Sequence, residues 1–588
     1  MKRVKQKQPV PNWRFYFVVA LLVALPVALV SRMASLQVLN GDRGVEFLQK
    51  QGNARAVRVM AVNATRGMIT DRNGQPLAVS TPVVSLWADP ATLREEDLAS
   101  LAKALHQSEA ALRKRLAAYA GKRFMYLARR LPPARAAQVS ELRIKGVHEQ
   151  REYQRFYPAG AYAAQLVGIV NVDDEGISGL ELAYDDWLRG APGKRKVVIS
   201  GKLDKRGRRV NEVVSVIGEL APVQPGKDLR LSIDLRLQYV QYRELARAVR
   251  ETGASSGSAV TLDVDTGEVL AVNSYPSFNP NNRRSISKHL KAGDTRNRVF
   301  TDVLEPGSTV KTLSVAAALE SGQYTIDSVI DTAPGEIVVA GKRIADPRNY
   351  GELSLARVLA KSSQVGTARL ALDLGVDPIW EMFNRFGLGQ STGSGFPGER
   401  AGALRVKDKW YLTEQVTLAY GYGLTATPLQ LARAYAAIAK DGELMPVSLL
   451  ARRDDVEVHG EQIIDKAIAS DLRDALAAVV KGDGTATRAA VPGFAVGGKT
   501  GTARKLGKTG YRDDSHFALF AGLAPIDNPK IVTVVLIDDP QGEEYGGGAV
   551  AAPVFSRIAA GVLPLLSVPF DDRALLAAAG DAQLGEAM

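Results

Sequence analysis

The longest uninterrupted apolar segment of the chain lies near its N-terminus. Phe15 to Ser31 is a run of 17 residues without a charge, and a helix of this length spans about 25 Å, close to the hydrocarbon thickness of a bilayer. Five basic residues precede the run, and no acidic residue occurs before Asp42. The positive-inside rule then places the N-terminus in the cytoplasm and the rest of the chain outside. Because no Ala-x-Ala site follows the run, we expect an uncleaved single-pass anchor rather than a cleaved signal peptide.

Between this segment and residue 228, shorter patterns predict a domain of mixed structure. The Val-rich stretch Val57–Val62 leads to Asp71-Arg72-Asn73-Gly74, which is typical of a hairpin turn between extended strands. Leucines at near-helical spacing predict helices over residues 91–147, and residues 190–228, rich in Lys, Arg, Gly and Val, predict extended strands. We expect this domain to be noncatalytic and to end near Gly226.

From about Leu229 the pattern changes to that of one large α+β unit. A helix is expected to about Arg250, with Ser232 or Asp234 as its cap, and short apolar runs on both sides of Asp265-Thr266-Gly267 predict a strand, a turn and a strand. Further apolar runs predict a buried helix, two central strands and a final helix, at residues 308–319, 517–521, 531–537 and 551–562. The tail from Asp571 is expected to be disordered.

Composition and charge narrow the function classes. A length of 588 residues predicts three or four units. The absence of cysteine excludes disulfides and thiolate metal sites, and the five histidines have no ligand spacing, so we expect no metal and no cofactor. The net charge is +12, but five of these charges precede the apolar run and no basic stripe is interleaved with aromatic residues. Nucleic-acid binding is therefore not expected.

Three short motifs, in a fixed order, carry the candidate chemistry. Ser308 and Lys311 stand three residues apart after a Pro-Gly break, so in a helix they share one face with Cβ atoms about 5–6 Å apart. The second motif is Lys361–Gly366, which contains Ser362, and the third is Lys499-Thr500-Gly501-Thr502. A Ser-x-x-Lys tetrad alone is weak evidence, but the ordered triplet is the signature of class A β-lactamases and penicillin-binding proteins.

The residue types in these motifs indicate acyl transfer through a serine. At a helix N-terminus, Ser308 lies where unpaired N–H groups and the helix dipole favour a developing oxyanion. Lys311 is a base only if it is neutral, and burial beside the second cation Lys499 lowers its pKa. Ser362 is placed to relay a proton to the leaving nitrogen. Lys499, with the threonine hydroxyls of its motif, offers charge and hydrogen bonds to a carboxylate.

Further segments make the whole chain resemble a known family. Together with the three motifs and the turn at Asp71, the segments Arg155-Phe156-Tyr157-Pro158 and Tyr420-Gly421-Tyr422-Gly423 are similar to class B penicillin-binding proteins. Within that family the chain resembles the FtsI-type peptidoglycan D,D-transpeptidases of Gram-negative bacteria. The resemblance implies an α+β protein with one transmembrane helix, an elongated noncatalytic pedestal domain, and a penicillin-binding transpeptidase domain with an antiparallel sheet, flanking helices and an all-helical subdomain. The expected parts are a cytoplasmic tip (1–14), the anchor (15–31), the pedestal (32–226), the transpeptidase domain (227–567) and a tail (568–588).

The resemblance also implies roles for individual residues. Its catalytic set is Ser308, Lys311, Ser362 and Lys499, with an oxyanion hole formed by the backbone N–H groups of Ser308 and Thr502. The substrate-binding residues it implies are Gln364, Thr500, Gly501, Thr502, Tyr420, Tyr422, Arg504 and Tyr545. Gln364 departs from the family, which usually has Asn there. The three tyrosines are as consistent with a half-buried core as with a cleft wall, and Arg504 is as consistent with a plain surface position.

The implied function is cross-linking of stem peptides that end in D-Ala-D-Ala, at the division septum of the cell inner membrane, with the bulk of the chain in the periplasm. β-Lactams are the implied inhibitors, and an FtsW-like glycosyltransferase and other division proteins are the implied partners. A D,D-carboxypeptidase, which uses water as acceptor, stays open, as does a weakened scaffold or paralogue if Gln364 impairs the site. A β-lactamase is disfavoured by the anchor and the pedestal, and a penicillin-sensing receptor by the 14 residues that precede the anchor.

Overall fold

The computed structural model describes residues 12–37, 57–122, 124–200, 212–406, 409–453, 455–507 and 510–571. They belong to two compact units, one made of Met1–Ala64 and Gly190–Pro225, the other of Thr65–Arg189 and Gly226–Met588. The predicted end of the pedestal domain at 226 and that of the transpeptidase domain at 567 stay predictions. The two compact units reflect contacts within the chain and do not test where a functional domain ends. Most of the predicted N-terminal tip and C-terminal tail lies outside the described residues.

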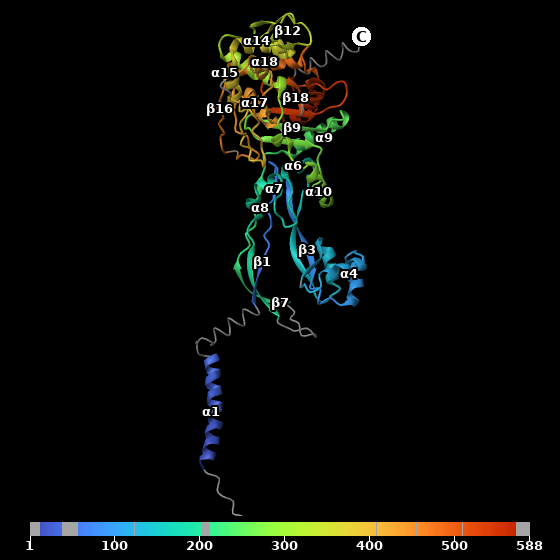
Figure 1. Cartoon of the computed structure of the whole chain (residues 1–588), viewed down its shortest axis with the longest axis vertical. Helices are drawn as coiled ribbons and strands as arrows, with labels where there is room; N and C mark the ends of the chain where they lie inside the picture. The colour runs from blue at the N-terminus through green and yellow to red at the C-terminus, as the bar shows by residue number, and fades with distance from the viewer. Residues whose placement is uncertain are drawn as a thin grey trace, which may run out of the picture. The chain divides into compact units, whose positions relative to one another are not determined.

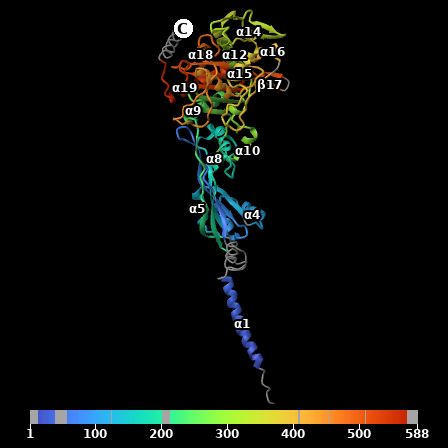
Figure 2. The ribbon, with the colours of Figure 1, turned by 90° about the vertical axis from the view of Figure 1, so that its left-hand side faces the viewer.

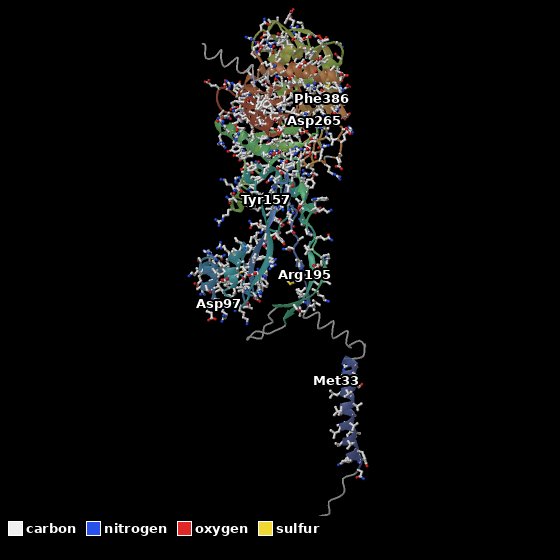
Figure 3. All side chains as sticks on the ribbon, turned by 180° about the vertical axis from the view of Figure 1, so that it is seen from behind. Met33, Asp97, Tyr157, Arg195, Asp265 and Phe386 are labelled. Carbon is white, nitrogen blue, oxygen red and sulfur yellow. The ribbon has the colours of Figure 1, made fainter. Side chains whose placement is uncertain are left out.

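The smaller unit contains the predicted anchor and a three-stranded antiparallel sheet. Helix α1 (Asn12–Gln37) carries exposed side chains on all sides, as the part labelled at Met33 shows (Figure 3). Its residues Asn12–Ser35 have a mean hydropathy of 2.3 and none of them is buried, as expected of a helix whose surroundings are lipid. The sheet has the order β1-β6-β7 and consists of β1 (Val57–Val62), β6 (Gly193–Ser200) and β7 (Glu212–Ala221). The extended strands predicted here are confirmed.

The first part of the larger unit is built on a second sheet. Its strands follow the order β4-β3-β2-β8, with β5 also paired to β3. The hairpin turn predicted at Asp71 joins β2 (Ile69–Thr70) to β3 (Pro76–Ala88), and Asp71 Oδ1 accepts hydrogen bonds from the N–H groups of Asn73 and Gln75, both at 2.8 Å. The strands are β2 (Ile69–Thr70), β3 (Pro76–Ala88), β4 (Met125–Leu131), β5 (Val147–Phe156) and β8 (Leu229–Arg230).

The prediction of helices throughout residues 91–147 is wrong for one segment. Helices α3 (Leu98–Ala104), α4 (Glu109–Ala118) and α5 (Pro133–Ser140) form as expected, but β4 lies between the last two. Met125 and Leu127 are buried and alternate with half-buried neighbours, which is the period-two pattern of a strand. The spacing of the leucines upstream does not extend into this segment.

Motifs that are far apart in the sequence meet in a buried ion cluster in this part of the unit. Glu181 accepts hydrogen bonds from Arg66 Nε and Arg155 Nε, both at 2.6 Å, and all three side chains are fully buried. Asp185 adds a carboxylate at 2.7 Å from Arg66 Nη1. Glu181 belongs to helix α7 (Gly179–Ala183), which is accompanied by α6 (Ala164–Val167) and α8 (Asp185–Arg189).

A five-stranded antiparallel sheet forms the centre of the rest of the larger unit (Figure 1). Its order is β10-β9-β19-β18-β17, so the two strands predicted as central, β18 and β19, lie inside the sheet. The strands are β9 (Ser256–Asp263), β10 (Val269–Tyr275), β17 (Gly497–Gly507), β18 (Gly510–Ala524) and β19 (Ile531–Asp538). β17 is an edge strand, which leaves one side of its backbone without a neighbouring strand.

Helices cover both faces of this sheet. α9 (Leu235–Glu251) and α19 (Gly547–Leu565) share one core with one face, and α12 (Lys311–Glu320) and α17 (Pro428–Ala439) share another core with the opposite face. As predicted, Asp234 caps α9 and accepts a hydrogen bond from Arg236 N. α19 is apolar and long enough to cross a membrane, but half of it is buried in the larger unit. α18 (Lys466–Val480) packs beside β17.

The helical part lies between β10 and β17 in sequence. α13 (Leu355–Lys361), α14 (Gln364–Leu374) and α15 (Val376–Arg385) contact α12, and α16 (Leu412–Ala419) contacts α14. Figure 2 shows α9 and α19 on one side of this part of the molecule, opposite α14 and α16. Shorter elements complete it: α10 (Arg283–Ala292), α11 (Arg298–Thr301), and the ribbons β11 (Val329–Asp331) with β14 (Glu352–Ser354), β12 (Glu336–Val339) with β13 (Lys342–Ala345), and β15 (Glu443–Leu444) with β16 (Glu461–Gln462).

Candidate active site

Ser308 lies in a tight turn that begins helix α12. The turn, Gly307–Val310, is a 3₁₀ helix, and the N–H group of Lys311 donates to the carbonyl of Ser308. Gly307 has a φ of +54° and donates its N–H to the carbonyl of Gly421 at 3.1 Å. Ser308 is half-exposed although its neighbours in the turn are buried. Its hydroxyl makes no hydrogen bond with another described residue, so it is accessible to a substrate.

The second motif meets the first through Lys311. Lys311 is fully buried, and its Nζ donates to the carbonyl of Ser362 at 2.6 Å and to Ser362 Oγ at 3.4 Å. Ser362 ends α13 with a φ of +55°, a conformation uncommon for a residue other than glycine. Burial lowers the pKa of Lys311 to about 7, while the charge of Asp346 acts in the opposite direction. The amine is therefore poised to exchange a proton near neutral pH.

The third motif supplies a second buried lysine. Lys499, on β17, is fully buried, and within the described part of the chain its Nζ makes only two long contacts, with the carbonyl of Thr500 at 3.4 Å and its Oγ1 at 3.5 Å. Burial lowers the pKa of Lys499 well below its ordinary value, and the charge of Lys311 lowers it further. Among the described residues, neither lysine is ion-paired with a carboxylate. Two unpaired ammonium groups at this depth disfavour each other, so the pair loses a proton readily.

The glycine of the third motif lets β17 pack against the serine turn. A Cβ atom at Gly501 would lie 2.9 Å from the carbonyl oxygen of Pro306 and 2.9 Å from the methyl group of Thr309. Any side chain there would therefore push the serine turn away from the strand. On either side, Thr500 Oγ1 lies 3.2 Å from Thr485 Oγ1, and Thr502 Oγ1 accepts a hydrogen bond from Gly547 N at 3.1 Å. The edge of β17 is thus fixed beside Ser308, with backbone groups available to an extended peptide.

Gln364 is not tied to this cluster. It begins α14, its side chain is exposed, and its amide makes no hydrogen bond with another described residue. Its backbone N–H donates to Asp346 Oδ1 at 2.5 Å, and Ser363 Oγ donates to Asp346 Oδ2. Asp346 thus holds the start of α14 and acts on the charge of Lys311. No motif in the sequence indicates Asp346, which lies 17 residues before Ser363.

Two of the three predicted tyrosines form an aromatic wall next to the serine turn. The rings of Tyr420 and Tyr422 meet edge to face at 5.9 Å, and Tyr422 meets Tyr511 in the same way at 5.7 Å. Glu305, three residues before Ser308, accepts hydrogen bonds from the Tyr511 hydroxyl and from Gly423 N, both at 2.9 Å. Tyr511 and Glu305, which sequence analysis missed, therefore join this wall to the serine turn.

Arg504 and Tyr545 gather around a residue that the sequence did not indicate. The ring of Tyr545 stacks on His516 with a centroid separation of 4.2 Å, and Arg504 lies opposite His516 in the pairing of β17 with β18. The guanidinium of Arg504 is ion-paired with Asp513 at 2.8 Å. Burial and the charge of Arg504 lower the pKa of His516. The structure links neither Arg504 nor Tyr545 by a hydrogen bond or ion pair to the described side chains of Ser308, Lys311 or Lys499.

Comparisons with known proteins agree with this site. A penicillin-binding protein dimerisation domain model matches residues 61–231, and a penicillin-binding protein transpeptidase domain model matches residues 257–560. The chain is 43% identical over 563 residues to a probable peptidoglycan D,D-transpeptidase, PbpC, of Pseudomonas aeruginosa, covering 95% of this chain and 96% of that protein. It is 41% identical over 577 residues to the peptidoglycan D,D-transpeptidase FtsI of Escherichia coli K12, covering 97% of this chain and 95% of that protein.

Solved structures give the same result. The transpeptidase domain of penicillin-binding protein 3 from Burkholderia pseudomallei is 41% identical, with a TM-score of 0.53, and the match covers 58% of this chain and 97% of that one. Penicillin-binding protein 3 of Mycobacterium tuberculosis, in complex with aztreonam, is 28% identical with a TM-score of 0.66. The match covers 87% of this chain and 98% of that one. The resemblance predicted from the motifs is confirmed. The chain belongs to the penicillin-binding proteins, a family of serine acyl-transfer enzymes, and has the class B arrangement of a dimerisation domain followed by a transpeptidase domain.

Proposed function

We propose that this protein is a peptidoglycan D,D-transpeptidase of the division septum that works through a serine acyl-enzyme. The observation that carries the proposal is the state of Lys311. It is fully buried, its pKa is lowered to about 7, and it is held by Ser362 one helical turn from a half-exposed serine. A base with a pKa near the working pH combines a populated neutral form with adequate basicity.

In the proposed acylation, Ser308 Oγ attacks the carbonyl carbon of the penultimate D-Ala while Lys311 Nζ takes the hydroxyl proton. The negative charge that develops on the carbonyl oxygen is stabilised by the backbone N–H groups of Ser308 and Thr502. The bond to the terminal D-Ala nitrogen then breaks, and that nitrogen receives a proton through Ser362. The products are an ester on Ser308 and free D-Ala.

Deacylation repeats these steps with an amine as the nucleophile. The amine of a second stem peptide attacks the ester carbonyl, loses a proton to Lys311, and expels Ser308 Oγ, which recovers its proton. The terminal carboxylate of the donor peptide is proposed to bind beside Lys499, Thr500 and Thr502. A carboxylate placed there favours the protonated form of Lys499, so substrate binding supplies the partner that this buried lysine lacks among the described residues.

We further propose that α1 anchors the protein in the inner membrane with its N-terminus in the cytoplasm. The support is an exposed apolar helix preceded by basic residues and followed by the rest of the chain. The partners we propose for the pedestal domain, an FtsW-like glycosyltransferase and other division proteins, follow from the resemblance to FtsI-type enzymes. Protease added to spheroplasts should digest the region after Ser31, whereas protection of that region would contradict this orientation.

The test of the catalytic proposal is covalent labelling of the full-length protein with a fluorescent penicillin. Ser308→Ala should abolish labelling and leave the unfolding temperature close to that of the wild type. Ser321→Ala, at the other end of α12, is the matched control and should label normally. Stoichiometric labelling of Ser308→Ala would reject the assignment. Release of D-Ala with formation of a cross-linked product supports a transpeptidase, whereas release with a hydrolysed product alone identifies a carboxypeptidase.

A further inference from the structure

A pocket of about 260 Å³ opens in the larger unit, and none of the predicted catalytic residues lines it. Its apolar wall includes Phe517 of β18, Leu536 of β19 and Leu304, which lies four residues before Ser308. Leu536 belongs to the core shared by the sheet with α12 and α17, and Phe517 packs against that core. The pocket is therefore on the same face of the sheet as the helix that carries Lys311.

A buried hydroxyl without a partner points into this pocket. Ser258 is opposite Leu536 in the pairing of β19 with β9 and is fully buried. Its neighbour Ala259 belongs to the core on the α9 face and Val260 to the core on the α12 face, so strand alternation directs Ser258 to the α12 face. Its Oγ has no hydrogen-bond partner among the described residues. A buried polar group in that state is a candidate for a hydrogen bond with a ligand.

The polar lining of the pocket has an excess of positive charge. Arg296 and Arg298 both contact the single carboxylate of Asp302, at 3.1 Å each, and Arg400 also lines the pocket. The other acid in the lining, Asp538, is already neutralised by Lys505 at 2.6 Å. Guanidinium groups arranged around a cavity are suited to carboxylate or phosphate ligands.

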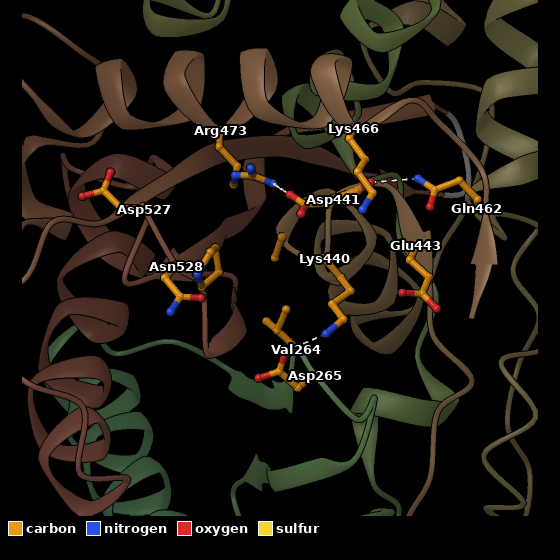
Figure 4. A pocket seen from close by; sticks show the side chains of 12 residues that line it. Val264, Asp265, Lys440, Asp441, Glu443, Gln462, Lys466, Arg473, Asp527 and Asn528 are labelled. Carbon is orange, nitrogen blue, oxygen red and sulfur yellow. Dashed lines mark hydrogen bonds and ion pairs between the residues drawn. The ribbon is translucent and has the colours of Figure 1, made fainter. Parts of the chain in front are cut away.

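A second pocket, shown in Figure 4, has the opposite balance. There Lys440 is paired with Asp265 at 2.7 Å, and Arg473 with Asp441 at 2.7 Å. Glu443 also lines that pocket, so acids match or exceed the bases that they face. The excess of guanidinium groups is thus not a general property of pockets in this unit.

We propose that the pocket beside Leu304 is a second substrate subsite, which binds a carboxylate of the stem peptide whose amine accepts the acyl group. This inference rests on the proposed transpeptidase function. Four residues span at most about 14 Å, which limits the separation of the Leu304 and Ser308 Cα atoms. On the other side of the pocket, Phe517 pairs with Ala503, the residue after Thr502. An extended peptide of five residues reaches about 17 Å, so one acceptor spans the distance between the pocket and the acyl-serine.

The chemistry of the pocket matches such a ligand. Arg296 and Arg298 bind the carboxylate, the Ser258 hydroxyl donates a hydrogen bond to it, and Phe517 and Leu304 contact the methyl or methylene groups next to it. The donor peptide, by contrast, presents its terminal carboxylate at Lys499. Separate positive sites for the two peptides allow the enzyme to hold donor and acceptor at once, which is the positioning that an amine needs to compete with water.

The experiment measures the two half-reactions of the full-length protein separately. Acylation is followed with a fluorescent penicillin, and transfer is followed with a depsipeptide donor and two acceptor peptides, one with its side carboxylate free and one with it amidated. Arg296→Gln and Ser258→Ala are the test variants, and Lys440→Gln, in the pocket of Figure 4, is the control. Arg296 is about half exposed and Ser258→Ala removes one atom, so both variants should fold.

We expect Arg296→Gln to lower transfer to the carboxylated acceptor about tenfold and Ser258→Ala to lower it about threefold, with penicillin acylation and transfer to the amidated acceptor unchanged. Equal losses with both acceptors, or no loss with either, would overturn the proposal. Competition by inorganic phosphate without discrimination between the acceptors would assign the pocket to a phosphate ligand instead. If the wild type is not acylated at all, the proposed function fails; if it is acylated but ignores the carboxylate, only the subsite fails.

Discussion

Two clusters of buried charge in the larger unit are built in opposite ways. In the first part of that unit, Glu181 lies between Arg66 and Arg155 and is ion-paired with both. In the transpeptidase part, Lys311 and Lys499 are equally buried, but among the described residues neither is ion-paired with a carboxylate. The number of buried charges is similar, so the difference lies in whether each charge is matched.

The consequences for protonation are also opposite. Burial alone would lower the pKa of Arg66, but Glu181 and Asp185 outweigh that effect and its pKa is raised. Burial of Lys311 is opposed only by the more distant Asp346, and its pKa falls to about 7. Buried side chains that are ion-paired therefore keep their charge and stabilise the fold. Buried lysines without a carboxylate partner exchange protons at working pH. Four predictions test this contrast.

The largest effect is expected from Lys311→Met. Penicillin acylation should fall at least about a thousandfold, because the base is removed. Thermal stability should stay the same or rise, since Met fills a similar volume without a charge to desolvate. In the wild type, the unfolded state binds more protons between pH 7 and 10.5, so stability should increase with pH over that range. The variant should lose the part of that increase that Lys311 contributes and keep the part that buried Lys499 contributes, as measured by thermal unfolding against pH.

Lys361→Met is the matched control for this prediction. Lys361 is also buried and precedes Ser362, but it is ion-paired with Asp483 and donates to its carbonyl at 2.8 Å. Its replacement should lower stability and reduce acylation far less than Lys311→Met does. If Lys311→Met unfolds at a lower temperature than Lys361→Met, the lysine of the Ser-x-x-Lys motif supports the fold, and the contrast does not hold.

The matched cluster should show the reverse behaviour. Glu181→Gln leaves two buried guanidinium groups without their shared carboxylate, which should destabilise the protein by about 3–5 kcal/mol. Acylation per folded molecule should be unchanged. Denaturant unfolding measures the first quantity and penicillin titration the second. Glu109→Gln, which breaks an exposed pair with Arg113, is the control and should change little. A stable Glu181→Gln protein would show that the cluster does not hold this part of the fold.

The third prediction concerns the pH profile of acylation. Because the neutral form of Lys311 is the base, the rate should fall about tenfold per pH unit below pH 7 and level off above it. The charge of Asp346 raises the pKa of Lys311, so Asp346→Asn should move the midpoint to lower pH. The midpoint is read from second-order acylation rates, independently of any change in the maximum rate. An unmoved midpoint would mean that another group limits acylation.

The residues of the site that could be predicted from the sequence are those that belong to short motifs. Ser308, Lys311 and Lys499 could be proposed from the sequence because short motifs with fixed spacing mark them, and the structure brings these motifs together. Glu305 and Tyr511 are 206 residues apart, and their hydrogen bond depends on how the β17–β18 ribbon meets the serine turn. Nothing in either segment shows that contact before the chain is folded. Short motifs therefore indicate the proposed reacting groups, but not the side chains that hold them in place.

The fold shows the same division between local and long-range information. β18, β19 and α9 were predicted because long apolar runs or a cap mark them, while β4 was missed among helices because its alternation covers only a few residues. Hydropathy also fails to separate α1 from α19, since both are long and apolar enough to cross a membrane. Only packing distinguishes them: no residue of Asn12–Ser35 in α1 is buried, and half of α19 is buried.

The smallest effect is expected at Gln364, an uncharged residue next to the unmatched pair. Its side chain is exposed and free of hydrogen bonds to other described residues, so it is available to a ligand rather than to the fold. Gln364→Asn should change β-lactam acylation rates by up to about fivefold, because one neutral hydrogen bond is worth roughly 1 kcal/mol. Gln364→Ala should be slower than both, since it removes the amide altogether. Second-order acylation rates with one penicillin compare the three proteins. If Gln364→Ala matches the wild type, the residue has no part in recognition, and the exposed start of α14 serves only to place Ser362 and Ser363.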